Sequence, residues 1–90
     1  MKIKAENSFW EAYSKLDERT KRAARKAFLI WKDDPFHPSL RFKCVVEKHG
    51  VWAVRITRRH RALGVWDKEE FTWFWIGDHD EYERIIKSLF

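Results

Sequence analysis

Basic side chains concentrate in the middle of the chain. Residues 41–61 carry seven lysines and arginines but a single carboxylate, Glu47, which gives the segment a net charge of +6. Residues 1–40 carry +3 and residues 62–90 carry −4, so the overall charge of +5 is unevenly distributed. A dense basic segment attracts polyanions such as nucleic acids. The alternative interpretation is that these residues form the solvated outer faces of strands.

One histidine has a sequence context that suits proton transfer. His79 is flanked by Asp78 and Asp80 and follows an apolar segment that ends at Gly77. A histidine titrates near neutral pH and can donate or accept a proton, and a ring beside carboxylates is suited to donation. The alternative is a local role for His79, in capping or packing the start of a helix.

Metal and thiol chemistry are not expected from the remaining candidates. The four histidines and Cys44 show no H-x-x-x-H or C-x-x-C spacing, so we expect no metal site and no cofactor. A lone cysteine excludes an internal disulfide framework, and the strand pattern predicts a buried Cys44 thiol. No Ser/His/Asp set is indicated.

Two helices should precede the basic segment. The residues from Ser8 to Glu11 fit a capping box and predict a helix over 8–16, and Asp17 is the expected cap of a second helix over 18–34, which Pro35 ends. Because only a residue or two separates the helices, they should pack as a hairpin.

The apolar period changes from 3.6 to 2 at Leu40. Strands are expected from residue 40 to 47, from 51 to 59 after a turn at His49-Gly50, from 61 to 66, and from 71 to 76, where Gly77 ends the last one. A short helix should cover residues 79–90, and residues 2–5 are a candidate edge strand.

These elements define the expected fold class, α+β. A helical hairpin should pack on one face of a four-stranded, antiparallel-rich sheet, with a candidate fifth strand and a short C-terminal helix, all in one domain over residues 1–90. The expected core members are Phe9, Tyr13, Phe28, Trp31, Val54, Ile56, Leu63, Phe74 and Ile76.

Length and composition limit the alternatives. The chain has 90 residues, 44% of them hydrophobic and 17% aromatic, which supplies a core for one small domain. It lacks an apolar run of about 18 residues and the pattern of a signal peptide, so we expect a cytoplasmic protein with no membrane partner.

Three segments resemble the RelE/ParE superfamily of bacterial type II toxins. They are DPFHPSLRFK (34–43), VWAVRITRRHRALGV (51–65), which is similar to the pattern Y-x-V-R-x-x-x-x-Y-R, and WFWIGDHDEYERII (73–86), which is similar to a strand–Gly–x–His/Arg ending. Together they cover most of the chain in the family's order.

The resemblance implies an mRNA endonuclease that acts on the ribosome without a metal and is held inactive by an antitoxin. It implies that Arg61 contacts the scissile phosphate, that Arg55 lies on the same face, and that His79 is the general acid. Tyr82 is similar to an aromatic residue in the closing helix of some members. The further residues expected to bind RNA are Arg41, Lys43, Arg58, Arg59 and His60.

Several alternatives stay open at this stage. Arg58 and Arg59 could be the solvated tip of a hairpin, His60 could be structural, and Tyr82 could be a core residue. The resemblance also leaves open a ParE-like toxin that inhibits DNA gyrase without catalysis, and a degenerate toxin that only binds its antitoxin.

Overall fold

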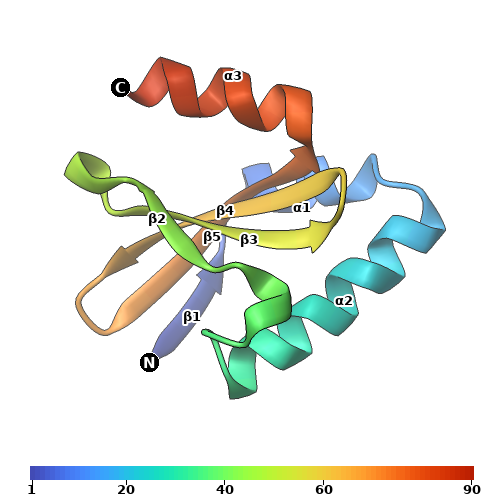
Figure 1. Cartoon of the computed structure of the whole chain (residues 1–90), viewed down its shortest axis with the longest axis horizontal. Helices are drawn as coiled ribbons and strands as arrows, with labels where there is room; N and C mark the ends of the chain where they lie inside the picture. The colour runs from blue at the N-terminus through green and yellow to red at the C-terminus, as the bar shows by residue number, and fades with distance from the viewer.

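A computed structural model describes residues 1–90 and places three helices around one sheet (Figure 1). The helices are α1 (Asn7–Ser14), α2 (Glu18–Asp33) and α3 (His79–Leu89). The strands are β1 (Lys2–Ala5), β2 (Lys43–Val46), β3 (Val51–Thr57), β4 (His60–Asp67) and β5 (Glu70–Asp78). Two short 3₁₀ helices, η1 (Pro38–Leu40) and η2 (Glu47–His49), flank β2.

The five strands form a single sheet in the order β1-β5-β4-β3-β2. Strands β2 to β5 are antiparallel neighbours, and β1 pairs in parallel with β5. The expected α+β fold and the edge strand at residues 2–5 are therefore confirmed. The parallel pairing of β1 makes the sheet mixed.

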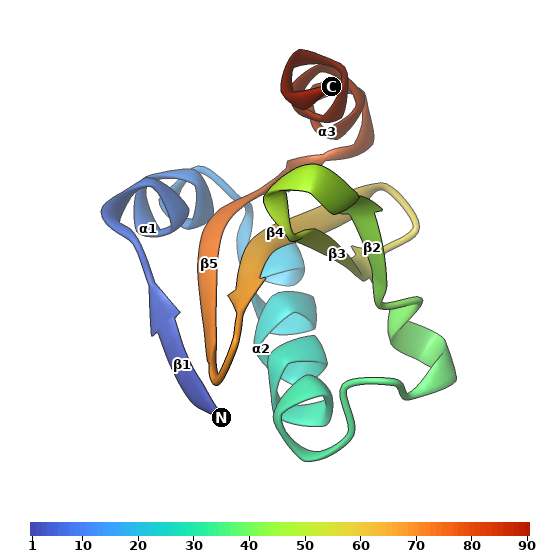
Figure 2. The ribbon, with the colours of Figure 1, turned by 90° about the vertical axis from the view of Figure 1, so that its left-hand side faces the viewer.

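Helices cover both faces of the sheet. Figures 1 and 2 show α3 on one face and α2 on the other. Phe9 of α1 contacts Phe28 of α2, with ring centroids 5.7 Å apart, so α1 and α2 share a face. The core beneath them contains Phe9, Ala24, Ala27, Trp31, Leu40, Phe42, Val54, Ala62, Phe71, Trp73 and Ile76. A smaller core beneath α3 contains Val46, Val51, Ala53, Leu63 and Tyr82.

The expected core residues divide into two groups. Five are buried, namely Phe9, Trp31, Val54, Leu63 and Ile76, and the other four, Tyr13, Phe28, Ile56 and Phe74, are half-buried. The half-buried side chains still pack against one of the two cores.

The two predicted helix starts have different outcomes. Asp17 caps α2 as predicted, since its carboxylate accepts a hydrogen bond of 2.7 Å from the N–H of Thr20. The predicted capping box at Ser8 is wrong, because α1 begins at Asn7 and Glu6 precedes it without a side-chain cap. The Ser8 hydroxyl instead donates to the carbonyl oxygen of Phe74, at 2.7 Å.

Three predictions about the strands also need correction. Cys44 is exposed rather than buried, because β2 is an edge strand and the core covers only its end, at Val46. Leu40 is buried but belongs to η1 rather than to a strand. Gly77 does not end β5, which continues to Asp78.

None of the helices is long and apolar enough to cross a membrane.

Candidate active site

A cationic cavity of about 160 Å³ lies between α3 and the adjoining strands. It is lined by Arg41, Lys43, Ala53, Arg55, Arg61, His79, Tyr82 and Glu83. These residues come from β2, β3, β4, α3 and the turn after η1, so only the folded chain brings them together. Six of them were candidate site residues in the sequence.

Strand register explains why Arg55 and Arg61 meet. The two arginines lie directly opposite each other in the β3–β4 ladder. Side chains opposite each other in an antiparallel pair lie on the same face of the sheet. On its other side Arg61 pairs with Gly77 of β5, two residues before His79. The predicted convergence of Arg61 and His79 on one concavity is confirmed, while their catalytic roles stay predictions.

Backbone carbonyls hold the guanidinium of Arg61. Its Nη1 donates to the carbonyl oxygens of Thr57, at 2.9 Å, and His60, at 3.0 Å. Partial burial, and next the positive charge of Arg55, lower the pKa of the Arg61 guanidinium from its usual value. An arginine stays charged at neutral pH despite such a shift, so the site offers a fixed cation to an anion.

Arg41 reaches the cavity through an unusual backbone conformation. Its φ is 47° and its ψ is 39°, in the left-handed region that non-glycine residues seldom adopt. This residue turns the chain from η1 into β2. Left-handed residues outside glycine cluster at functional sites.

The start of α3 fixes the position of His79. Asp78 caps the helix by accepting a hydrogen bond of 2.9 Å from the N–H of Glu81. The N–H of His79 donates to the carbonyl oxygen of Arg59 at 2.7 Å. The Nε2 of His79 lies 3.5 Å from Oε1 of Glu83, one helical turn further on. Sequence reasoning missed Glu83, although its i,i+4 spacing from His79 was a usable signal.

Tyr82 belongs both to the core and to the cavity. Its side chain is 8% exposed, and its ring centroid lies 5.5 Å from that of His79. Burial, and next the negative charge of Glu83, raise the pKa of the Tyr82 phenol. The phenol is therefore protonated at neutral pH and can donate a hydrogen bond.

Arg58, Arg59 and His60 are not brought into this cavity. They line a separate groove of about 510 Å³ beside α2, together with Arg19, Thr20, Ala23 and Thr57. The Nδ1 of His60 lies 2.8 Å from the Thr57 hydroxyl. Neighbouring residues of a strand point to opposite faces, which separates His60 from Arg61.

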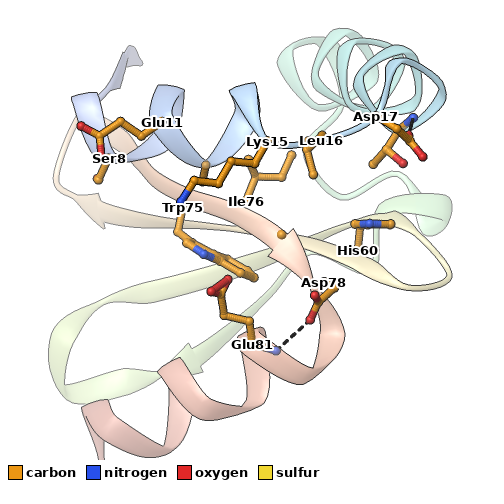
Figure 3. A pocket seen from close by; sticks show the side chains of 13 residues that line it. Ser8, Glu11, Lys15, Leu16, Asp17, His60, Trp75, Ile76, Asp78 and Glu81 are labelled. Atoms are coloured by element: carbon orange, nitrogen blue, oxygen red, sulfur yellow. Dashed lines mark hydrogen bonds between the residues drawn. The ribbon is translucent and has the colours of Figure 1, made fainter.

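A third hollow, of about 470 Å³ and larger than the cationic cavity, lies between α1, the end of β5 and the start of α3 (Figure 3). Four carboxylates line it, those of Glu11, Asp17, Asp78 and Glu81, and it contains no arginine. Asp17 and Asp78 already cap helices. The hollow is thus less suited to phosphate than the cationic cavity, despite its size.

A family model described as a ParE-like toxin domain matches residues 18–84. A search of curated proteins finds no match.

Solved toxin structures share the fold over nearly their whole length. The YoeB/ParE toxin from Agrobacterium tumefaciens superposes with a TM-score of 0.67 at 21% identity, covering 88% of this chain and 99% of that one. The RelB-RelE antitoxin-toxin complex from Methanococcus jannaschii gives 0.73 at 6% identity, covering 91% and 96%. YafQ from E. coli strain BL21(DE3) gives 0.72 at 8% identity, covering 89% and 94%. The resemblance in the sequence is therefore confirmed, and the chain belongs to the family of ParE-like toxin domains within the RelE/ParE superfamily.

Proposed function

We propose that the chain is the toxin of a type II toxin–antitoxin system and cleaves mRNA on the ribosome without a metal ion. The observation that carries this proposal is the cationic cavity, in which Arg55 and Arg61 meet His79 and Tyr82. Fixed cations beside a proton donor are the groups that RNA cleavage requires.

The proposed reaction uses the RNA's own 2′-hydroxyl. The 2′ oxygen forms a bond to the adjacent phosphorus, the bond from phosphorus to the 5′ oxygen breaks, and the 2′ proton passes to water. Arg61 and Arg55 stabilise the additional negative charge on the phosphoryl oxygens, since guanidinium groups match phosphate geometry. His79 protonates the leaving 5′ oxygen.

The other lining residues position the substrate. Arg41, in the turn after η1, and Lys43, at the start of β2, extend the cationic surface and bind neighbouring phosphates of the RNA. Tyr82 donates a hydrogen bond from its protonated phenol, or stacks its ring on a base. Arg58 and Arg59 bind RNA outside the cavity, in the groove beside α2.

The expected protein partner is a cognate antitoxin. The RelB-RelE antitoxin-toxin complex from Methanococcus jannaschii shares this fold, and so does the archaeal RelE-RelB complex from Pyrococcus horikoshii. The net +6 of residues 41–61 offers an acidic antitoxin segment a complementary surface. Such a segment would cover the cationic cavity and block RNA.

A second candidate function has one observation in its favour, the ParE-like description of the matching family model. ParE-like toxins that inhibit DNA gyrase act through protein contacts and need neither Arg61 nor His79. A degenerate toxin that binds only its antitoxin would also function without these two residues.

One paired experiment separates these functions. The chain is expressed from a tightly controlled promoter, growth is followed, and mRNA 5′ ends are mapped, while purified protein is added to a gyrase supercoiling assay. We expect growth arrest, new 5′ ends within translated regions and unchanged supercoiling. Growth arrest with inhibited gyrase and no new 5′ ends would establish the alternative, and unaffected growth would point to a degenerate toxin.

A further inference from the structure

The cationic cavity contains a single carboxylate, that of Glu83. The four surrounding cations are Arg41, Lys43, Arg55 and Arg61. Glu83 forms no ion pair with any of them, and its one ionic partner is His79, with 3.5 Å between Oε1 and Nε2. The carboxylate is thus directed at the candidate general acid rather than at the arginines.

We propose that Glu83 is a positioning residue that orients the imidazole of His79 for proton donation. This inference rests on the proposed function of His79. A carboxylate that engages one ring nitrogen fixes the orientation of an imidazole and leaves the other nitrogen for the substrate. The Glu83 carboxylate contacts Nε2, and Nδ1 is then the nitrogen that donates a proton to the leaving 5′ oxygen.

Two further contacts restrict the position of His79, but neither of them fixes the rotation of its ring. The N–H of His79 is bonded to the carbonyl oxygen of Arg59, which holds the backbone. The ring lies beside Tyr82 at 5.5 Å, a contact that limits its position without selecting a nitrogen. Only Glu83 distinguishes Nε2 from Nδ1.

The place of His79 in the helix brings this carboxylate to its ring. His79 is the first residue of α3, and Glu83 lies one helical turn further on. Side chains four residues apart lie on the same face of a helix, so Glu83 is the helix neighbour of the imidazole.

The same carboxylate opposes the binding of phosphate. A negative charge in a cavity that holds a phosphodiester repels the substrate. Removal of the charge should therefore have two effects of opposite sign, tighter RNA binding and slower cleavage. A residue that served only as a counter-ion would show the first effect without the second.

The test compares Glu83→Gln with the matched control Glu81→Gln. Both variants remove one negative charge from an exposed position of α3, but Glu81 lines the other hollow and not the cationic cavity. Single-turnover cleavage is measured on ribosomes programmed with a defined mRNA, and binding with an RNA whose 2′-hydroxyl at the cleavage site is replaced by hydrogen. We expect Glu83→Gln to lower the maximal rate about 10-fold to 100-fold and to tighten binding. Glu81→Gln should change neither.

A double-mutant cycle tests whether Glu83 acts through His79. In a His79→Asn background, Glu83→Gln should cause no further loss of rate, because the group that it orients is gone. Additive losses, or equal rates for Glu83→Gln and Glu81→Gln, would overturn the proposal.

Failure of the proposed function is recognised separately. If the wild-type chain cleaves no RNA, that function is wrong, and the contact is then judged by NMR. Glu83→Gln should move the ring ¹⁵N signals of His79 and Glu81→Gln should leave them in place. Ring signals that are unchanged in both variants would contradict the orienting role.

Discussion

The backbone N–H of His79 donates a hydrogen bond of 2.7 Å to the carbonyl oxygen of Arg59. The same turn between β3 and β4 also holds Arg61, whose Nη1 donates to the carbonyl oxygen of Thr57. One turn therefore fixes two site residues that come from different elements. Both hydrogen bonds are accepted by main-chain carbonyl oxygens. Substitution of the side chains of the turn should therefore leave both hydrogen bonds in place.

The side chains of Arg58 and Arg59 should contribute to RNA affinity rather than to chemistry. The double variant Arg58→Ala, Arg59→Ala removes two exposed cations from the groove beside α2. We expect weaker RNA binding and a slope of log affinity against log salt that is smaller by about 1 to 2, since each lost phosphate contact reduces counterion release. The rate at saturating RNA should be unchanged. A large loss of that rate would show that the turn is part of the reacting site.

Arg61 should be needed for the chemical step. Arg61→Ala removes a fixed cation from the cavity, and we expect a loss of about 10²–10³-fold in single-turnover cleavage, as for a lost oxyanion donor. Arg61→Lys should restore only part of the rate, because an ammonium group cannot form the paired hydrogen bonds of a guanidinium. Circular dichroism controls for folding. Full toxicity of a folded Arg61→Ala variant would exclude the proposed role.

His79 should supply the proton. His79→Ala leaves α3 capped by Asp78, so the fold should be kept, while cleavage should fall about 10²–10⁴-fold through loss of general acid catalysis. An RNA with a 5′-thio leaving group needs no protonation and should be cleaved equally by the wild type and the variant. A defect that persists with the thio substrate would assign His79 to another role.

Much of the site could be predicted because its parts depend on local pattern. The alternation of β3 and β4 puts Arg55 and Arg61 on one face, and Gly77 and His79 follow at the adjoining end of β5. The same alternation places His60 on the opposite face, a consequence of strand geometry that the expected RNA-binding set did not take into account.

The role of Ser8 could not be predicted from the sequence. The β4–β5 register shifts between Leu63 and Gly64, whose partners are Trp75 and Trp73. Phe74 is thus the extra residue of a bulge, and its carbonyl oxygen accepts a hydrogen bond from the Ser8 hydroxyl. A bulge does not change the pattern of an apolar run, so the sequence does not show the carbonyl that Ser8 contacts. The sequence pattern therefore favours a helix cap at Ser8.

Tyr82 should make the stability of the fold depend on pH in the alkaline range. Burial and Glu83 raise the pKa of its phenol in the folded state, with Arg61 acting in the opposite direction. The folded state therefore prefers the protonated phenol. Its contribution to stability is complete below the unfolded value of about 10 and is lost as pH rises through the folded pKa. Urea unfolding at about pH 8 and about pH 11 should show a smaller loss for Tyr82→Phe than for the wild type. Equal losses would contradict this linkage.

Gly77 should be required because of the space that it leaves and not because of its backbone conformation. Its φ is not positive, so alanine can adopt its conformation, but an added Cβ would lie 2.5 Å from Cζ2 of Trp75. We expect Gly77→Ala to lower the free energy of unfolding by about 1–3 kcal/mol, since the indole must move. The displaced indole should also disturb Arg61, the partner of Gly77 across the ladder, and slow cleavage. In a Trp75→Leu background the obstacle is gone, and the same substitution should be nearly neutral. Urea unfolding of the wild type, the two single variants and the double variant measures this coupling. If Gly77→Ala costs as much stability in the Trp75→Leu background as in the wild type, the steric explanation is wrong.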